Sequence, residues 1–278
     1  MSIEDGGAGG PPGAPSPGGA GGGHVGDSEA LGRLVHGLHE HIEKLERLVS
    51  AEGRSVEARV VPAWQRATAG EHRLPVAGFV AVAIVLQVVL PPRYFLGPRL
   101  VPVLLEAVLA LGLVAANPRR IDRSSRTLRG ASLLLIATIS VANAWSAVRL
   151  IDALVSGGSG PSAPVLLGSG AAIYVTNIIV FGLWYWECDR AGPVARAHGD
   201  RPYPDLLFPQ MGGLHLAPPD WRPTFVDYLY VSYTNATAFS PTDTMPMARW
   251  TKLLFLAQSA IALAVAALVI ARAVNILR

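Results

Sequence analysis

The chain has 278 residues, of which 51% are hydrophobic and only 15% are charged. Together with a mean hydropathy of +0.37, this composition excludes an ordinary soluble enzyme and indicates a polytopic membrane protein. Acidic residues outnumber basic ones up to Arg73 and basic residues outnumber acidic ones after it, so the net charge of +3 arises in the apolar part of the chain. Nothing in this charge distribution favours a nucleic-acid partner.

Residues 1–27 are rich in glycine and proline and have almost no large apolar side chain. Such a segment cannot bury enough surface to offset the entropy of ordering, so we predict a disordered tail. The basic start and apolar run of a signal peptide are missing. We therefore expect the first transmembrane span itself to direct the chain into the membrane.

A heptad pattern of apolar residues begins at Leu31. Its two seam positions are filled by Val35, Ile42, Val49 and Val56 and by Leu31, Leu38 and Leu45. β-branched residues at one position and leucine at the other favour a parallel two-stranded coiled coil. The seam is short and contains glycines that weaken a helix. We predict that residues 28–72 form a cytoplasmic coiled coil or amphipathic helix, and that residues 28–60 contact a cytoplasmic protein partner.

Histidines and glutamates recur along this predicted helix. The spacing places His36 beside His39 and Glu40 on one face, and two imidazoles with a carboxylate are ligands that zinc accepts. A fourth ligand and an HExxH motif are missing from the sequence. We therefore interpret these residues as a solvated polar face and expect no metal and no other cofactor.

Five apolar runs follow Arg73, and each is close to the roughly 20 residues that a helix needs to cross a bilayer. They comprise residues 74–90, 100–116, 130–148, 164–186 and 253–274. We predict an all-α polytopic membrane helix bundle with five transmembrane helices. In this interpretation residues 73–188 form a four-helix membrane region and residues 189–222 a cytoplasmic loop.

The loop arginines indicate the orientation of the bundle. Residues 117–129 include Arg119, Arg120, Arg123, Arg126 and Arg129, whereas residues 151–163 include no lysine or arginine. By the positive-inside rule, the arginine loop is cytoplasmic. We predict a multi-pass protein of the cell (inner or plasma) membrane with a cytoplasmic N-terminus and an external C-terminus. The alternative has six spans, with residues 224–239 crossing and the C-terminus inside.

Three polar residues lie at similar predicted depth inside the apolar runs. A carboxyl group at Glu106 costs roughly 3 kcal/mol or more in a membrane unless it is neutralised or partnered. Gln87 and Asn143, in the first and third runs, reach nearly the same depth. We expect these residues to form an intramembrane polar layer. It serves either as a proton or ion relay or as interhelical hydrogen bonding worth about 0.6 to 2 kcal/mol per bond.

Other polar and aromatic residues lie near the ends of the runs. The aromatic ones are Trp145, Trp184, Tyr185 and Trp186. We predict that these amphipathic rings anchor the helices at the membrane interfaces. Arg149 is followed three residues later by Asp152, which is its expected partner.

Residues 223–278 are predicted to form a short helix followed by the final span. Residues 224–239 are too short and too rich in hydroxyl groups to cross a bilayer comfortably, so we expect a re-entrant or interfacial helix. This hairpin resembles the pore module of potassium channels, in which a pore helix precedes a filter, an aspartate, a proline and an inner helix. The residues in matching places are Tyr230, Tyr233, Thr237, Asp243, Pro246, Lys252, Leu253 and Leu254.

The channel resemblance implies a pore entrance or vestibule. Its lining would be Asp227, Thr234, Thr237, Ser240, Thr242 and Asp243. At the filter position, residues 238–242 contain no glycine and include Pro241, which does not suit a ring of inward carbonyls. We therefore expect no potassium-type filter. Asp243 has a second interpretation, in which it caps the final helix together with Thr244.

The end of the chain is also similar to an uncharacterised family of bacterial multi-pass membrane proteins, defined only by a domain of unknown function. The similar elements are Gly212-Gly213-Leu214, Asp227-Tyr228-Leu229-Tyr230, Ser240 to Asp243 and a terminal helix that ends near Asn275. This resemblance implies a multi-pass membrane fold, and the family has no established activity to carry over to this chain. The sequence also lacks GxSxG, P-loop and HExxH motifs, so we expect no enzyme.

Two functions fit these observations. The first is a non-enzymatic membrane organiser or interaction protein that contacts the lipid bilayer, itself and a cytoplasmic partner. The alternative is a channel-like ion permeation protein without a potassium-type filter. Both predict a homo-oligomer, because the heptad seam favours a dimer and a potassium-channel-like pore implies a tetramer.

Overall fold

A computed structural model of the chain describes residues 37, 39, 41–45, 61–121, 125–155, 162–212, 217–238 and 243–276. The chain divides into two compact units, Met1–Val60 and Val61–Arg278. Described residues of the first unit are helical, and the seam residues Ile42 and Leu45 are exposed. The predicted tail, most of the heptad and two members of the histidine face, His36 and Glu40, lie outside the described residues.

The second unit is built from α-helices joined by short elements. The helices are α2 (Arg73–Val89), α3 (Leu100–Ala116), α4 (Arg126–Val155), α5 (Ala163–Cys188), α6 (Pro193–His198), α7 (Phe225–Ala238) and α8 (Arg249–Ile276). The 3₁₀ turns are η1 (Ala63–Gln65), η2 (Pro92–Tyr94), η3 (Asp189–Ala191) and η4 (Pro209–Met211). Strand β1 (Glu71–His72) pairs antiparallel with β2 (Arg120–Ile121), and β3 (Leu206–Leu207) with β4 (Met245–Pro246). The predicted α-helical class is confirmed.

Three helices are long and apolar enough to cross a membrane, over Arg126–Val155, Pro164–Ala191 and Arg249–Arg272. α2 and α3 have 17 residues each and are therefore about 25 Å long. Helix α4 begins earlier than predicted, because the Ser125 hydroxyl accepts a hydrogen bond from the N–H of Leu128 at 3.1 Å and caps the helix. The loop after α3 is correspondingly shorter than predicted.

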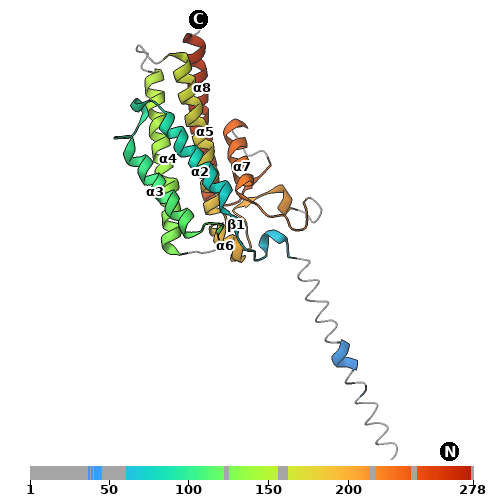
Figure 1. Cartoon of the computed structure of the whole chain (residues 1–278). Helices are drawn as coiled ribbons and strands as arrows, with labels where there is room; N and C mark the ends of the chain where they lie inside the picture. The colour runs from blue at the N-terminus through green and yellow to red at the C-terminus, as the bar shows by residue number, and fades with distance from the viewer. Residues whose placement is uncertain are drawn as a thin grey trace, which may run out of the picture. The chain divides into compact units, whose positions relative to one another are not determined.

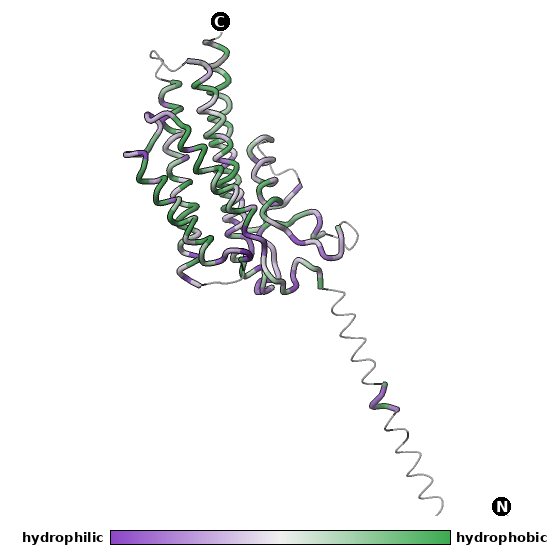
Figure 2. Tube along the Cα trace, viewed as in Figure 1, coloured by the Kyte–Doolittle hydropathy of each residue, from purple (hydrophilic) through white to green (hydrophobic). Residues whose placement is uncertain are grey.

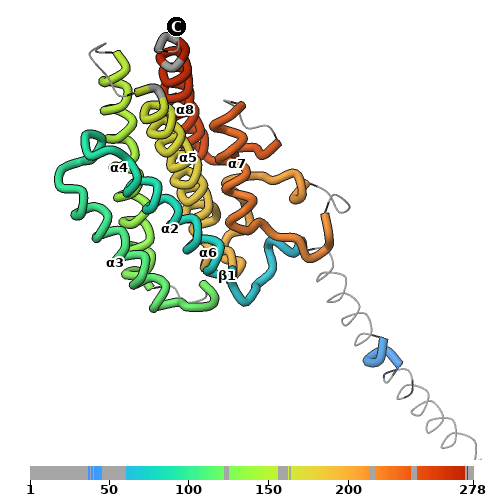
Figure 3. The backbone as a smooth tube through the Cα atoms, turned by 45° about the horizontal axis from the view of Figure 1, so that its top comes forward, coloured from blue at the N-terminus to red at the C-terminus, as the bar shows by residue number. Residues whose placement is uncertain are grey.

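Helix α5 is central in the second unit and contacts α2, α4, α7 and α8. Figures 1 and 3 show α3 and α4 on one side of α5 and α7 on the other. The peripheral helix α3 buries Glu106 and Leu113. Several of its other leucines and valines, including Leu104, Val108 and Leu111, are exposed. The unit therefore presents an apolar surface along α3.

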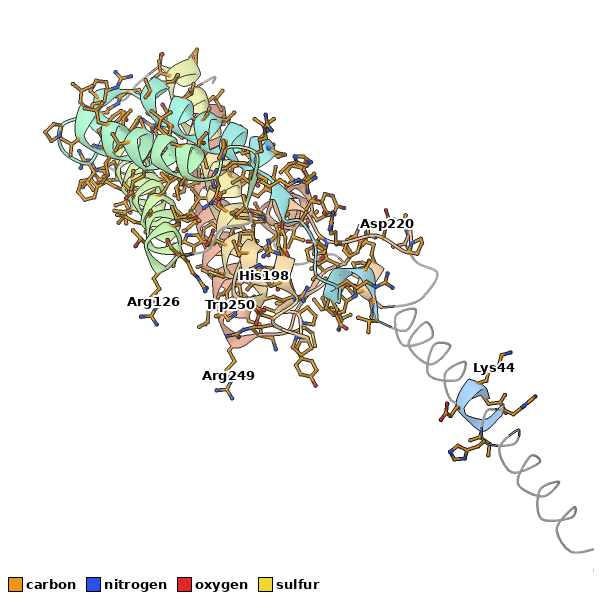
Figure 4. All side chains as sticks on the ribbon, turned by 60° about the horizontal axis from the view of Figure 1, so that its bottom comes forward. Lys44, Arg126, His198, Asp220, Arg249 and Trp250 are labelled. Carbon is orange, nitrogen blue, oxygen red and sulfur yellow. The ribbon has the colours of Figure 1, made fainter. Side chains whose placement is uncertain are left out.

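One end of the second unit gathers hydrophilic residues. The β1–β2 pair joins the start of α2 to the end of α3 there, and β3–β4 lies at the start of α8. Figure 2 shows hydrophilic residues near α6 and β1 and mainly hydrophobic residues along the helices. In Figure 4, Arg126 and Arg249 project from this same end. We name it the arginine-rich end, defined by Arg73, Arg119, Arg120, Arg126, Arg129, Arg190, Arg196, Arg201 and Arg249.

The hydrophobic core has two main zones. Toward the arginine-rich end, α2, α4, α5 and α7 bury a cluster that includes Val80, Ile139 and Phe225. Toward the opposite end, the η2 turn packs on α4, α5 and α8 in a second cluster. In this second zone α5 and α8 pack closely at Gly170. A Cβ atom added at this position would lie only 2.7 Å from the Val269 side chain. A glycine at position 170 therefore permits the approach of the two helices.

One predicted boundary moves, and one predicted loop contains secondary structure. Residues 61–72 belong to the second unit rather than to the N-terminal helical region. Residues 189–222, predicted as a loop, contain η3, α6, β3 and η4. The physical reason is a set of buried arginine contacts: Arg190 donates to the carbonyl of Trp64, and Arg196 donates to Glu71. Partners so distant in the chain leave no local pattern.

Candidate functional site

Two of the three residues predicted to share a polar layer, Gln87 and Glu106, are hydrogen-bonded to each other. The Gln87 amide donates to the Glu106 carboxylate at 3.1 Å, and both side chains are buried. Asn143 is also buried, on α4. Within the described part of the chain, Glu106 Oε1 and Asn143 Oδ1 have no hydrogen-bond partner. One hydrogen bond therefore links α2 to α3 in this layer. Among the described residues, no hydrogen bond links Asn143 to either of the other two side chains.

A second buried polar network, which the sequence interpretation missed, joins α5, α7 and α8. Gln258 on α8 is fully buried, and its Oε1 accepts hydrogen bonds from the Tyr185 hydroxyl at 2.7 Å and the Asn235 amide at 2.8 Å. Its Nε2 donates to the carbonyl and hydroxyl of Ser232. All hydrogen-bonding capacity of this side chain is used. A glutamine inside the last apolar run was the sequence signal for this contact.

Two residues assigned to a pore entrance have hydrogen-bond partners at the N-terminal cap of α7 or within the helix. The Asp227 carboxylate accepts hydrogen bonds from the N–H and the hydroxyl of Thr224, at 2.7 and 2.8 Å. Because α7 begins at Phe225, this is the N-terminal geometry in which the third helical residue bonds back to the cap. Thr234 is buried and donates to the Val231 carbonyl at 3.0 Å.

The next pore-assigned residues lie at and beyond the end of α7. Thr237 is exposed, and its hydroxyl donates to the Tyr233 carbonyl at 2.9 Å. Tyr233 and Tyr230 are themselves more than half exposed. Ser240 and Thr242 lie outside the described residues. The outer surface of α7 therefore carries two tyrosines and a threonine.

Asp243 is exposed and precedes strand β4. Helix α8 begins six residues later, at Arg249. The interpretation in which Asp243 and Thr244 cap this helix is therefore wrong, because a strand intervenes between the two residues and the helix start. At the actual start of α8, the Thr251 hydroxyl donates to the Ala248 carbonyl at 2.6 Å.

A buried charged cluster follows α5 directly, and sequence reasoning missed it as well. Asp189 is fully buried and accepts hydrogen bonds from the N–H groups of Asp205 and Leu206, at 2.9 and 3.2 Å. The Tyr228 hydroxyl donates to it at 2.6 Å. Burial raises the pKa of Tyr228 well above its ordinary value. The phenol therefore stays protonated and remains a hydrogen-bond donor to Asp189.

Arg196 on α6 is the central cation of this cluster. It is buried and donates to the carbonyls of Trp186 and Asp189, at 2.6 and 3.0 Å, and to Glu71 at 2.9 Å. The Trp186 indole donates to the other Glu71 oxygen at 2.8 Å. Burial lowers the pKa of Arg196, but the pKa is raised overall because the carboxylates of Glu71 and Asp189 favour the charged form. The guanidinium stays charged and links three segments of the chain.

Arg190 completes the cluster in a left-handed backbone conformation, with φ of 50°. This conformation costs about 1 to 2 kcal/mol in a residue with a Cβ atom. Three hydrogen bonds offset the cost: the backbone N–H to Asp205, Nε to the Arg201 carbonyl, and Nη1 to the Trp64 carbonyl. These partners hold the segment after α5 against residues 61–72. The arrangement stabilises the arginine-rich end.

The aromatic residues predicted as interfacial anchors divide into two groups. Tyr185 and Trp186 are buried, so their assignment as anchors is wrong. Their polar atoms bind Gln258 and Glu71 instead of headgroups. Trp145 is 39% exposed and donates to the Phe95 carbonyl at 3.0 Å. The expected pair of Arg149 with Asp152 is confirmed, with 3.5 Å between Nη1 and Oδ2 on the surface.

Comparison with known protein families, curated proteins and solved structures finds no match. The resemblances to potassium-channel pore modules and to the bacterial membrane family therefore stay predictions. Within the described residues, no group of three or more His, Cys, Asp or Glu side chains is placed to hold a metal ion.

Proposed function

We propose that α2, α3, α4, α5 and α8 cross the cell membrane, with the arginine-rich end and the N-terminus in the cytoplasm and the C-terminus outside. The starts of α2, α4 and α8 and the ends of α3 and α5 lie at this one end, as five alternating spans require (Figure 1). The apolar surface of α3 supports lipid contact, because water disfavours so large an apolar patch. In this topology α7 is the helix that does not cross.

The topology is tested by reporters fused to the C-terminus of the full chain. A phosphatase that is active only outside the cytoplasm should be active, and a reporter that fluoresces only in the cytoplasm should stay dark. The reverse pair of results would support six spans and reject this topology. Fusions after Ser162, between α4 and α5, provide the matched external control.

Within this topology, we propose a non-enzymatic membrane organiser or interaction protein that assembles with copies of itself. The observation that carries this proposal is an exposed stripe on α7, formed by Val226, Tyr230, Tyr233 and Thr237. These residues recur at three- and four-residue intervals and therefore share one helix face. Tyrosine is enriched at protein interfaces. In the first unit, the exposed Ile42 and Leu45 provide a second candidate surface for self-association.

Assembly is tested by measuring the mass of the detergent-solubilised protein. Tyr230→Ser with Tyr233→Ser should lower the mass of the assembly, whereas Tyr203→Ser, at an 84% exposed site outside α7, should not. Ile42→Asn with Leu45→Asn tests the heptad seam separately. An unchanged mass in both double variants would reject self-association through these surfaces.

Ion permeation remains the second candidate function. It is favoured by Thr237 on the same α7 surface and by Asp243, which follows α7 in the chain and is exposed; both would face a shared vestibule in an oligomer. Two other vestibule candidates suit this role less, because Thr234 is buried and the Asp227 carboxylate binds the capping residue Thr224, which supports the interaction proposal instead. Vesicles containing the purified protein discriminate the two. Flux of a small ion that Asp243→Asn reduces would favour permeation, and absence of flux across a range of potentials and pH would remove it.

A further inference from the structure

A pocket of about 880 Å³ lies between α2, α3 and α4 and extends to the arginine-rich end. Its volume is in the range of roughly 300 to 1,000 Å³ that is typical of small-molecule sites. Apolar side chains from the three helices form its walls, among them Val80, Ile84, Ala110, Val114, Leu135 and Ile136. The walls suit a hydrocarbon chain and offer few polar groups to a water-soluble ligand.

The part of this pocket that lies at the arginine-rich end is cationic. Its charged lining consists of Arg73, Arg126, Arg129 and Arg201 against Glu187 and Asp200. One Glu187 oxygen already accepts a hydrogen bond from the Ser132 hydroxyl at 2.8 Å. Arg126 and Arg129 are exposed, and Figure 4 shows Arg126 projecting from the end of the bundle. The net positive charge favours an anionic group at this position.

Arg73 provides an independent sign of a missing partner. Its Nε atom is buried, and among the described residues it has no hydrogen-bond acceptor. A buried donor without an acceptor is destabilising, because it has lost its hydrogen bonds to water. An acceptor oxygen of a ligand held at the cationic part of the pocket would remove this destabilisation.

We propose that this pocket binds an anionic phospholipid, with an acyl chain between α2, α3 and α4 and the phosphate at Arg73, Arg126 and Arg129. Guanidinium groups bind phosphate through paired, charge-assisted hydrogen bonds. A free phosphate would leave the apolar walls uncovered, and an uncharged amphiphile would leave the excess of four arginines over two carboxylates uncompensated. Access from the cytoplasmic leaflet rests on the topology proposed above, whereas binding itself can be measured without a bilayer.

The test uses the purified full-length protein in detergent and native mass spectrometry. Phosphatidylglycerol is titrated against phosphatidylcholine with identical acyl chains. We expect at least about tenfold tighter binding of phosphatidylglycerol, and loss of that preference in Arg126→Gln with Arg129→Gln. Both residues are exposed, so this double variant should fold normally. Arg149→Gln, an exposed arginine at the other end of α4, should keep the preference.

Two further arms identify the ligand part that is recognised. Ala110→Trp fills the pocket and should weaken binding of both lipids by a similar factor, while glycerol phosphate should compete poorly. Equal affinity for the two lipids, or a preference that survives the arginine double variant, would overturn the proposal. Competition by glycerol phosphate at the same concentration as the lipid would also overturn it, in favour of a small-anion site. None of these results depends on the number of spans.

Discussion

Arg196 and Glu71 are 125 residues apart in the sequence, yet Nη2 of the arginine lies 2.9 Å from Oε1 of the glutamate. The contact joins α6 to the strand that precedes α2. Both partners make further hydrogen bonds, Arg196 to the Trp186 carbonyl and Glu71 to the Trp186 indole. This pair therefore connects the N-terminal segment of the second unit to the end of α5.

Replacing Arg196 by glutamine should destabilise the folded protein by about 3 kcal/mol. Loss of one partner from a buried ion pair leaves the other charge without compensation. The measurement is thermal unfolding of the solubilised protein, in which the midpoint should fall. Arg149→Gln breaks an exposed pair with Asp152 and should cost less than about 1 kcal/mol. Equal midpoints for the two variants would contradict the assignment of Arg196 as a structural cation.

Gln258→Leu should destabilise the packing of α7 on α5 and α8 by about 1 to 3 kcal/mol. The substitution deprives the Tyr185 hydroxyl of its acceptor and removes a bond from Asn235. Tyr185→Phe removes one of these bonds together with its donor, so we expect a smaller loss of about 0.6 kcal/mol. Chemical denaturation in detergent measures both. If leucine at position 258 increased stability, the network would not be holding α7 in place.

Gly170→Ala should lower stability, whereas Gly168→Ala should not. A Cβ atom at position 170 would lie 2.7 Å from the stiff Val269 side chain, while nothing lies within 4 Å of one at position 168. At the open site, the higher helix propensity of alanine should stabilise α5 by up to about 1 kcal/mol. Thermal unfolding of the two variants in parallel tests the close approach of α5 and α8. A common effect of both changes would refute it.

Thr224→Ala should destabilise the start of α7 by about 1 kcal/mol, because it removes the hydroxyl that bonds to Asp227. Asp227→Asn retains an acceptor oxygen and should cost less than Asp227→Ala. Hydrogen exchange at residues 225–230 reports the change locally. Residues 249–254, at the start of α8, provide the internal control and should exchange at an unchanged rate in all three variants.

The apolar runs predicted the helices well, because hydrophobicity sustained over a helix length is a local property of the chain. Helix α3 has the predicted bounds, and α2 differs by one residue at each end. The sequence also placed Gln87 and Glu106 at the same level along their helices, because that level follows from counting residues along each run. It did not show which side of a helix faces its neighbour. Asn143 lies at the same level but makes no hydrogen bond to the other two residues in the described part of the chain.

The arginine-rich end could not be predicted in the same way. Arg190, Arg196 and Asp189 have the composition of an ordinary cytoplasmic loop, and their burial depends on partners in residues 61–72 and on α7. Tyr185 and Trp186 were mistaken for interfacial aromatics because their hydrogen-bond partners, Gln258 and Glu71, are distant in the chain. A positive φ at a non-glycine residue such as Arg190 has no sequence signature, because contacts elsewhere impose it.

The contact between Glu71 and Arg196 also orders events during synthesis. At roughly 5 to 20 residues per second, a ribosome needs about 6 to 25 s to make the 125 residues that separate the two partners. Throughout that interval α2, α3, α4 and α5 emerge before Arg196, the partner of Glu71, has been made. The N-terminal segment of the second unit is translated first but gains this contact only after α5 has been made. A chain that stalls before Pro193 lacks Arg196, so Glu71 has no arginine partner at this end of the bundle.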